Sequence, residues 1–122
     1  FLAKVTKSGK TYYLGSNGKL ILLKKKEKKL PFIFGEFKNK DFFKLLKVID
    51  NNKFDYNQIK NLFYYSSGRW DIETHSGVII KLPRDKLNES MELTMQILNQ
   101  NDFNQIKIID MRQKNQVIIN EQ

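Results

Sequence analysis

Hydrophobic and polar residues alternate in short blocks at the start of the chain, and turn-forming residues separate the blocks. Leu2–Lys7 and Thr11–Leu14 are predicted as strands on either side of a turn at Ser8-Gly9-Lys10. Gly15-Ser16-Asn17-Gly18 is again rich in turn formers, and the apolar run Leu20–Leu23 follows it. The chain is therefore expected to begin with hairpin-connected strands.

Two later segments place apolar residues at helical spacing, so that each forms one apolar stripe. The first predicted helix is Lys40–Asp50, ended by Asn51-Asn52, and the second covers about Lys86–Asn99. The first stripe consists of Phe42, Leu45, Leu46 and Ile49. The second consists of Leu87, Met91, Met95 and Leu98.

The rest of the pattern is strand-like. Ile59–Tyr65, Arg69–Thr74 and Val78–Leu82 are predicted as three strands between the helices, and Ile106–Met111 and Gln116–Glu121 as two strands after them. Short connections between successive strands favour antiparallel pairing. The prediction is an α+β fold, a mainly antiparallel sheet with two helices packed on one face.

Two stretches before the first helix are predicted to interrupt the sheet. In Leu30–Gly35, Pro31 should break strand pairing and Gly35 should mark a turn. The charge run Lys24–Lys29 is expected to be an exposed strand end or loop. The whole chain, residues 1–122, is of a size that one domain commonly has, and no internal repeat is apparent.

The formal net charge of +9 raises the possibility of an anionic partner, such as nucleic acid or phospholipid. Arginine, which recognises phosphates and guanine through two hydrogen bonds, occurs only at Arg69, Arg84 and Arg112. This scarcity of arginine weakens the case for nucleic-acid binding. A nucleic-acid-binding domain remains the alternative function. Its stacking platforms would come from nine aromatic residues: Phe32, Phe34, Phe37, Phe42, Phe43, Phe63, Tyr64, Tyr65 and Trp70.

Candidate catalytic and metal-binding patterns are weak. Ser8–Thr11 resembles the end of a phosphate-binding loop, but Lys4 stands where that loop needs glycine, and a strand follows instead of a helix. The chain has no cysteine, and its only histidine, His75, lies in a predicted turn. Asp71 and Glu73 share a strand face, and we expect both to be solvated. No enzyme, metal site or cofactor is predicted, although a catalytic site built from Asp71, Glu73 and His75 stays open as an alternative.

Several motifs in sequence order resemble the FtsQ/DivIB family of bacterial cell-division proteins. Gly68–Glu73, with Arg69-Trp70 inside it, is followed by Ser76–Pro83, which ends in Leu82-Pro83. Ile109-Asp110-Met111-Arg112 is similar to the Ile/Val-Asp-Leu-Arg strand of the family, and Gln116–Ile119 stands at its last strand. Upstream, Leu30–Gly35 resembles the Leu-Pro-x-x-x-Gly segment, and Tyr12-Tyr13-Leu14 with Gly18–Ile21 resembles the opening hairpin.

This resemblance implies that the chain is the C-terminal β domain of a non-catalytic docking protein. An upstream helix would anchor it in the cytoplasmic membrane, followed by a POTRA domain, with the β domain on the periplasmic side. The implied partners are the division proteins FtsB and FtsL. No small-molecule substrate is implied.

The resemblance also implies which residues bind the partner. The last strand would pair with a strand of FtsB, and Arg112 matches an arginine that pairs with an acid of FtsB. Arg69 lies near a second basic position. Relatives carry aromatic residues after the arginine and near the chain end, where this chain has Gln113 and Asn120-Glu121. The expected partner-binding residues are Arg69, Arg112, Gln113, Lys114, Asn115, Gln116, Val117, Ile118 and Ile119.

Overall fold

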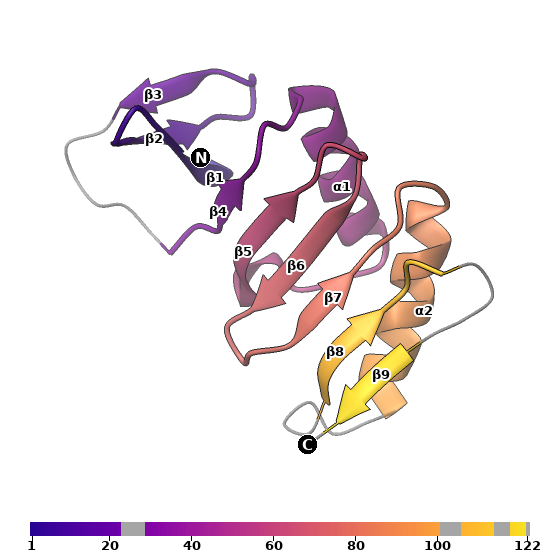
Figure 1. The fold of residues 1–122 in the computed structure, drawn as a ribbon. Coiled ribbons are helices and arrows are strands. Elements are labelled where there is room, and N and C mark those ends of the chain that lie inside the picture. Colours follow the sequence, from indigo (N-terminus) through magenta and orange to yellow (C-terminus); the bar gives the residue numbers. More distant parts are fainter. Residues whose placement is uncertain (23–28, 101–105, 114–117, 122) are drawn as a thin grey trace.

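The computed structural model describes residues 1–22, 29–100, 106–113 and 118–121. Within these residues nine strands form one sheet in the order β3-β2-β1-β4-β5-β6-β7-β8-β9, and two helices pack beside it (Figure 1). The predicted strands before, between and after the helices are all present. The elements are β1 Ala3–Lys7, β2 Lys10–Leu14, β3 Leu20–Leu22, β4 Phe32–Phe34, α1 Asn39–Asn51, a 3₁₀ turn at Tyr56–Gln58, β5 Ile59–Tyr64, β6 Trp70–Thr74, β7 Ile79–Lys81, α2 Leu87–Gln100, β8 Ile106–Asp110 and β9 Ile118–Glu121.

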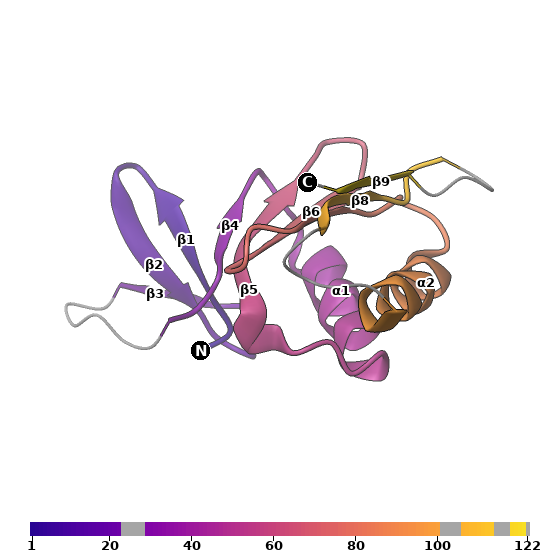
Figure 2. The ribbon, with the colours of Figure 1, turned by 90° about the horizontal axis from the view of Figure 1, so that it is seen from below.

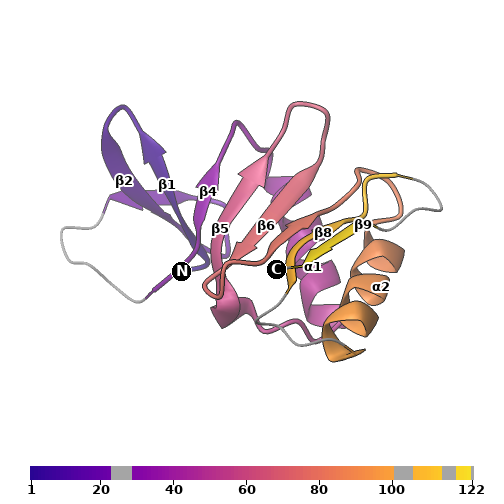
Figure 3. The same ribbon diagram turned by 60° about the horizontal axis from the view of Figure 1, so that its bottom comes forward.

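Both helices cover the same face of the sheet, beneath β5–β9, and the opposite face carries no helix in the described part of the chain (Figure 2). The α+β prediction is therefore confirmed. The β1–β3 hairpins extend the sheet away from the helices, as Figure 3 also shows. Strand pairing is antiparallel wherever a short turn joins the strands, and parallel between β4 and β5 and between β7 and β8, where a helix makes the connection.

The interpretation of Leu30–Gly35 as a break in the sheet was wrong. Phe32–Phe34 forms β4, a central strand that pairs in parallel with β1 on one side and β5 on the other. Pro31 is compatible with this because it precedes the strand, and its carbonyl oxygen accepts a hydrogen bond from the backbone N–H of Lys4 at 2.9 Å. Gly35 ends the strand with φ of +100°, as expected for a turn residue.

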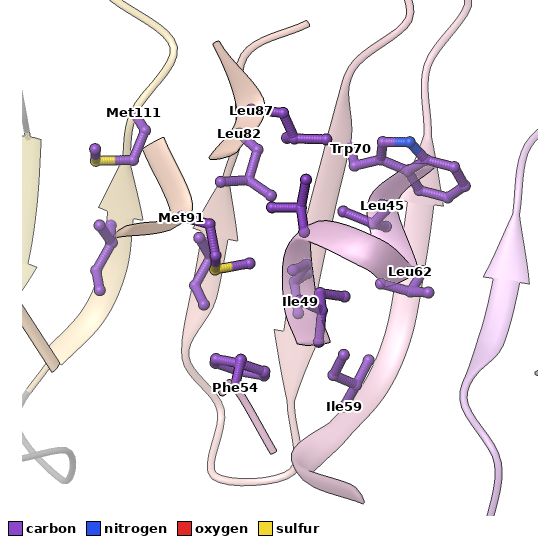
Figure 4. Packing of buried hydrophobic residues seen from close by; sticks show 14 of the residues in the cluster. Leu45, Ile49, Phe54, Ile59, Leu62, Trp70, Leu82, Leu87, Met91 and Met111 are labelled. Carbon is purple, nitrogen blue, oxygen red and sulfur yellow. The ribbon is translucent and has the colours of Figure 1, made fainter. Parts of the chain in front are cut away.

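The core lies between the helices and the covered face of the sheet (Figure 4). Successive strand residues point to opposite faces, so that Leu62, Ile72, Ile80 and Ile109 all point toward the helices and are fully buried. The predicted apolar stripes were correct except at two positions. Leu46 and Met95 are only partly buried and pack against the core, while α1 buries Val48 and α2 buries Thr94 and Ile97.

α1 ends at the predicted residues. The Asn52 side chain donates a hydrogen bond to the carbonyl oxygen of Val48 at 2.8 Å and another to the Asn88 side chain at the start of α2, at 3.0 Å. Lys53 then takes a left-handed conformation with φ of 57°, a common way to end a helix. The two helices are thereby joined at this end by a side-chain hydrogen bond.

Candidate partner-binding edge

The outermost strand at the C-terminal end of the sheet is β9. It pairs with β8 in antiparallel register, from Ile106 opposite Glu121 to Asp110 opposite Ile118. Among the residues that the structure describes, no strand pairs with the other side of β9. Such an edge presents unpaired backbone N–H and C=O groups to any chain that approaches it in an extended conformation.

The structure places the predicted partner-binding residues as follows. Ile118 and Ile119 belong to β9, and Arg112 and Gln113 lie just beyond the end of β8 and are exposed. Arg69 lies in the turn between β5 and β6. Lys114, Asn115, Gln116 and Val117 lie outside the described residues, as does most of the run Lys24–Lys29.

Arg112 forms a forked ion pair with Asp110, two residues earlier. Its Nε donates to Asp110 Oδ1 at 2.9 Å and its Nη2 to Asp110 Oδ2 at 2.6 Å, while its backbone N–H also donates to Oδ1 at 3.0 Å. The hydrogen bonds from the Arg112 side chain hold the pKa of Asp110 below its ordinary value. Arg112 keeps 43 % of its side chain exposed. Asp110 thus orients the Arg112 side chain while part of that side chain stays exposed.

Arg69 is held in a second network on the same face. Its Nη1 donates to Asp71 Oδ1 at 3.1 Å and to the carbonyl oxygen of Leu82 at 3.0 Å, and its guanidinium lies 4.8 Å from the centre of the Tyr65 ring. The Tyr65 hydroxyl donates to Asp71 Oδ2 at 2.9 Å. Burial and this hydrogen bond raise the pKa of Tyr65, and the charges of Arg69 and Arg112 oppose the shift.

Strand register connects the two networks. Asp71 of β6 lies opposite Lys81 of β7, Lys81 lies opposite Asp110 of β8, and Asp110 lies opposite Ile118 of β9. Asp71, Lys81 and Asp110 share the open face, since their neighbours Ile72, Ile80 and Ile109 point toward the helices. A row of alternating charge therefore crosses β6, β7 and β8, the strand next to the free edge.

Sequence reasoning missed Tyr65, Asp71, Lys81 and Asp110 as parts of this site. One signal was present: an arginine and an aspartate stand two apart both at Arg69–Asp71 and at Asp110–Arg112. Residues two apart in an extended chain share a face, so both pairs could have been expected to meet. The expectation that Asp71 is solvated was wrong, because only 6 % of it is exposed.

The other candidate chemistry is not brought together. Glu73 accepts a hydrogen bond from Asn61 at 2.7 Å, and His75 is exposed in the turn between β6 and β7, as predicted. Ser8 and Gly9 form the tight β1–β2 turn with φ of 50° and 75°, which confirms the hairpin reading of Ser8–Thr11. In the described ranges no group of three His, Asp or Glu residues could hold a metal ion.

The aromatic residues are divided between the core and the open face. Phe42 and Trp70 are buried to 2 % exposure or less and cannot stack with nucleic-acid bases. Phe34 and Tyr65 remain exposed.

No helix in the described part of the chain has both the length and the apolar composition that crossing a membrane requires.

Comparison with known proteins identifies the family. A search of curated proteins finds no match to this chain. The family model for the cell division protein FtsQ/DivIB, C-terminal, matches residues 3–112, which run from the first residue of β1 to Arg112. This match covers most of the 122 residues, and the chain therefore belongs to the FtsQ/DivIB family of cell-division proteins.

Proposed function

We propose that this chain is a non-catalytic docking module of the division machinery, and that it binds FtsB and FtsL by adding a strand of FtsB to the free edge of β9. The observation that carries the proposal is the position of β9 at the end of the sheet, in a chain of the FtsQ/DivIB family. Strand addition supplies affinity through backbone hydrogen bonds, while side chains beside the edge supply specificity.

Arg112 is the side chain best placed to supply that specificity. It follows β8, the strand next to the edge, and Asp110 already fixes its orientation. A carboxylate of FtsB can approach the exposed side of the guanidinium and form a charge-assisted hydrogen bond. Arg69, which is only 20 % exposed, would contribute mainly by supporting Asp71 and Tyr65 beneath the partner.

The proposal includes the place of this domain in the cell. The domain would lie on the periplasmic side of the cytoplasmic membrane, carried by a single upstream membrane helix and a POTRA domain. Nucleic acid is the less favoured partner, because two of the aromatic residues that could stack with bases lie in the core and because Arg69 and Arg112 are paired to aspartates.

The test is a titration of the domain with a peptide covering the periplasmic end of FtsB, followed by backbone amide NMR shifts. Shifts concentrated on Ile106–Glu121 are expected. Arg112→Glu should weaken binding, mainly by slowing association, because it reverses a charge beside the edge. Lys47→Glu is the matched control, since it makes the same change of charge at an exposed residue of α1, away from the sheet edge, and should leave binding nearly unchanged. No shifts at millimolar peptide would overturn the proposal.

Proline substitution separates strand addition from other modes of binding. Successive strand residues direct their N–H groups to opposite sides, so that one of Ile118→Pro and Ile119→Pro removes a donor from the free edge and the other removes one from the pairing with β8. The first variant should stay folded and lose binding. If both variants are folded and bind the peptide unchanged, strand addition is wrong.

A further inference from the structure

A pocket of about 390 Å³ lies at the end of the sheet where α1 begins. The start of α1, the β5–β6 turn and the β7–α2 loop come together there, near the top of Figure 1. Among the predicted partner-binding residues that the structure describes, none lines it, although Arg69 lies between two lining residues, Gly68 and Trp70. The lining consists of Lys38, Lys40, Asp41, Lys44, Tyr64, Ser66, Ser67, Gly68, Trp70, Arg84, Asp85 and Leu87.

Positive charge dominates this lining. Lys40 and Lys44 lie on α1, Lys38 directly precedes that helix, and Arg84 lies in the β7–α2 loop. In the described part of the chain the ion pairs are Arg69–Asp71 and Arg112–Asp110, so these four cations have no acidic partner within 4.0 Å there. Cations that converge on a hollow raise the local concentration of anionic ligands.

Contacts on two sides give the pocket a defined shape. Gly68 has φ of +89°, and a Cβ atom at this position would lie 3.1 Å from Cδ of Arg84, so the glycine allows the Arg84 stem to lie across the turn. On the other side the Tyr64 hydroxyl donates to Asp41 Oδ2 at 3.1 Å, and the Tyr64 ring packs edge-on against Trp70 with 4.8 Å between centroids. Trp70 is buried and forms part of the floor.

The two acids in the lining restrict the class of ligand. Asp41 and Asp85 stand among the four cations, so a ligand of uniform negative charge would be repelled at two positions. A polypeptide instead carries separate carboxylates and, between them, backbone N–H groups and hydroxyls that can donate to Asp41 and Asp85. The Ser66 and Ser67 hydroxyls in the β5–β6 turn can hydrogen-bond to such a backbone.

We infer that this pocket is a docking site for an acidic segment of a partner protein, in which carboxylates alternate with uncharged polar residues. The site does not use the edge of β9 and does not depend on strand addition. It would allow the domain to hold a second partner, or a second segment of the same partner, while the sheet edge is occupied.

The test uses a synthetic peptide of alternating glutamate and serine, with its glutamine-and-serine counterpart as the neutral control. The only tryptophan of the chain, Trp70, lines the pocket, so its fluorescence reports binding there. We expect the acidic peptide to change this fluorescence, the neutral peptide to leave it unchanged, and added salt to weaken binding. Equal binding of both peptides, or no binding at low salt, would overturn the inference.

Charge-removing variants locate the site. The double variant Lys40→Gln and Lys44→Gln should weaken binding of the acidic peptide by roughly tenfold, as expected for the loss of two exposed ion pairs. Lys47→Gln is the matched control, because this exposed lysine of α1 does not line the pocket, and it should change binding by less than about twofold. Arg84→Gln tests the opposite wall independently. Equal losses in the Lys47 and Lys40/Lys44 variants would show a nonspecific charge effect and refute the site.

Two further probes, polyphosphate and vesicles containing phosphatidylglycerol, distinguish the classes of ligand. A polypeptide partner would be refuted if either probe binds more tightly than the acidic peptide, with the same dependence on Lys40 and Lys44.

The variants Ile118→Pro and Ile119→Pro test whether this site is separate from the sheet edge. The proline variant that loses the FtsB peptide should bind the acidic peptide normally. Loss of both ligands in a folded variant would show that the two sites are not separate.

Discussion

The two faces of the sheet are built from the same strands but by different chemistry. Toward the helices, β5 to β8 present aliphatic side chains in adjacent register, and all are completely buried. Toward the open face, one residue along, the same strands present Phe63, Asp71, Lys81 and Asp110. The covered face is selected for packing, whereas the open face keeps charged groups that only other side chains of that face can bury.

Asp71 and Asp110 show how this second kind of burial works. Their exposures are 6 % and 8 %, although no helix covers them in the described structure. Asp71 is covered by Tyr65 and Arg69, which hydrogen-bond to it from the β5–β6 turn, and Asp110 is covered by Arg112. A buried carboxylate is tolerated only with such partners. The described part of the open face therefore contains pre-oriented arginines.

The largest difference between the faces should appear when adjacent residues of β6 are truncated. Ile72→Ala removes a fully buried side chain from the covered face and should lower the free energy of unfolding by about 2–5 kcal/mol. Glu73→Ala removes one open-face hydrogen bond to Asn61 and should cost no more than about 1.5 kcal/mol. Urea denaturation of both variants measures the difference. Equal losses would mean that the open face is as tightly packed as the core.

An intermediate effect is expected for Asp71→Ala, which leaves the Tyr65 hydroxyl without its acceptor and leaves Arg69 with only the carbonyl oxygen of Leu82. Losing a buried, charge-assisted partner should cost about 1–3 kcal/mol, more than Glu73→Ala on the same strand face. Tyr65→Phe, which removes one of the two donors to Asp71, should lower the free energy of unfolding by less than half as much as Asp71→Ala does. If Asp71→Ala and Glu73→Ala destabilise equally, the burial of Asp71 has no energetic consequence, and the proposed network is wrong.

The same contrast explains which features the sequence could predict. The covered face depends on the positions of apolar residues, which are visible in the sequence, and α1 was found within one residue of Lys40–Asp50 at each end. β4 was missed because it has only three residues and follows Pro31, both of which weaken the strand pattern. Its role depends on parallel pairing with β1 and β5, which are distant in sequence.

The open face could be predicted only in part. Arg112 was identified by resemblance to the family, but its bond to Asp110 was not expected. The burial of Asp71 depends on the β5–β6 turn, which brings Tyr65 and Arg69 over the same strand face. Alternation along β6 places Asp71 and Glu73 on one face, yet it cannot show that one is buried and the other partly exposed.

The smallest effect sharpens the comparison at the sheet edge. Arg112→Gln removes the hydrogen bonds that lower the pKa of Asp110, so this pKa should rise, which an NMR titration of the side-chain carboxyl measures directly. Because the folded-state pKa of Asp110 lies below the unfolded value, the pair stabilises the fold above the unfolded pKa and loses this effect as the pH falls through the folded pKa. The stability difference between wild type and variant should thus be present near neutral pH and vanish in strong acid. A difference that persists in acid would show that Arg112 stabilises the edge by packing, not by its charge, and its availability to an acidic partner would then need another explanation.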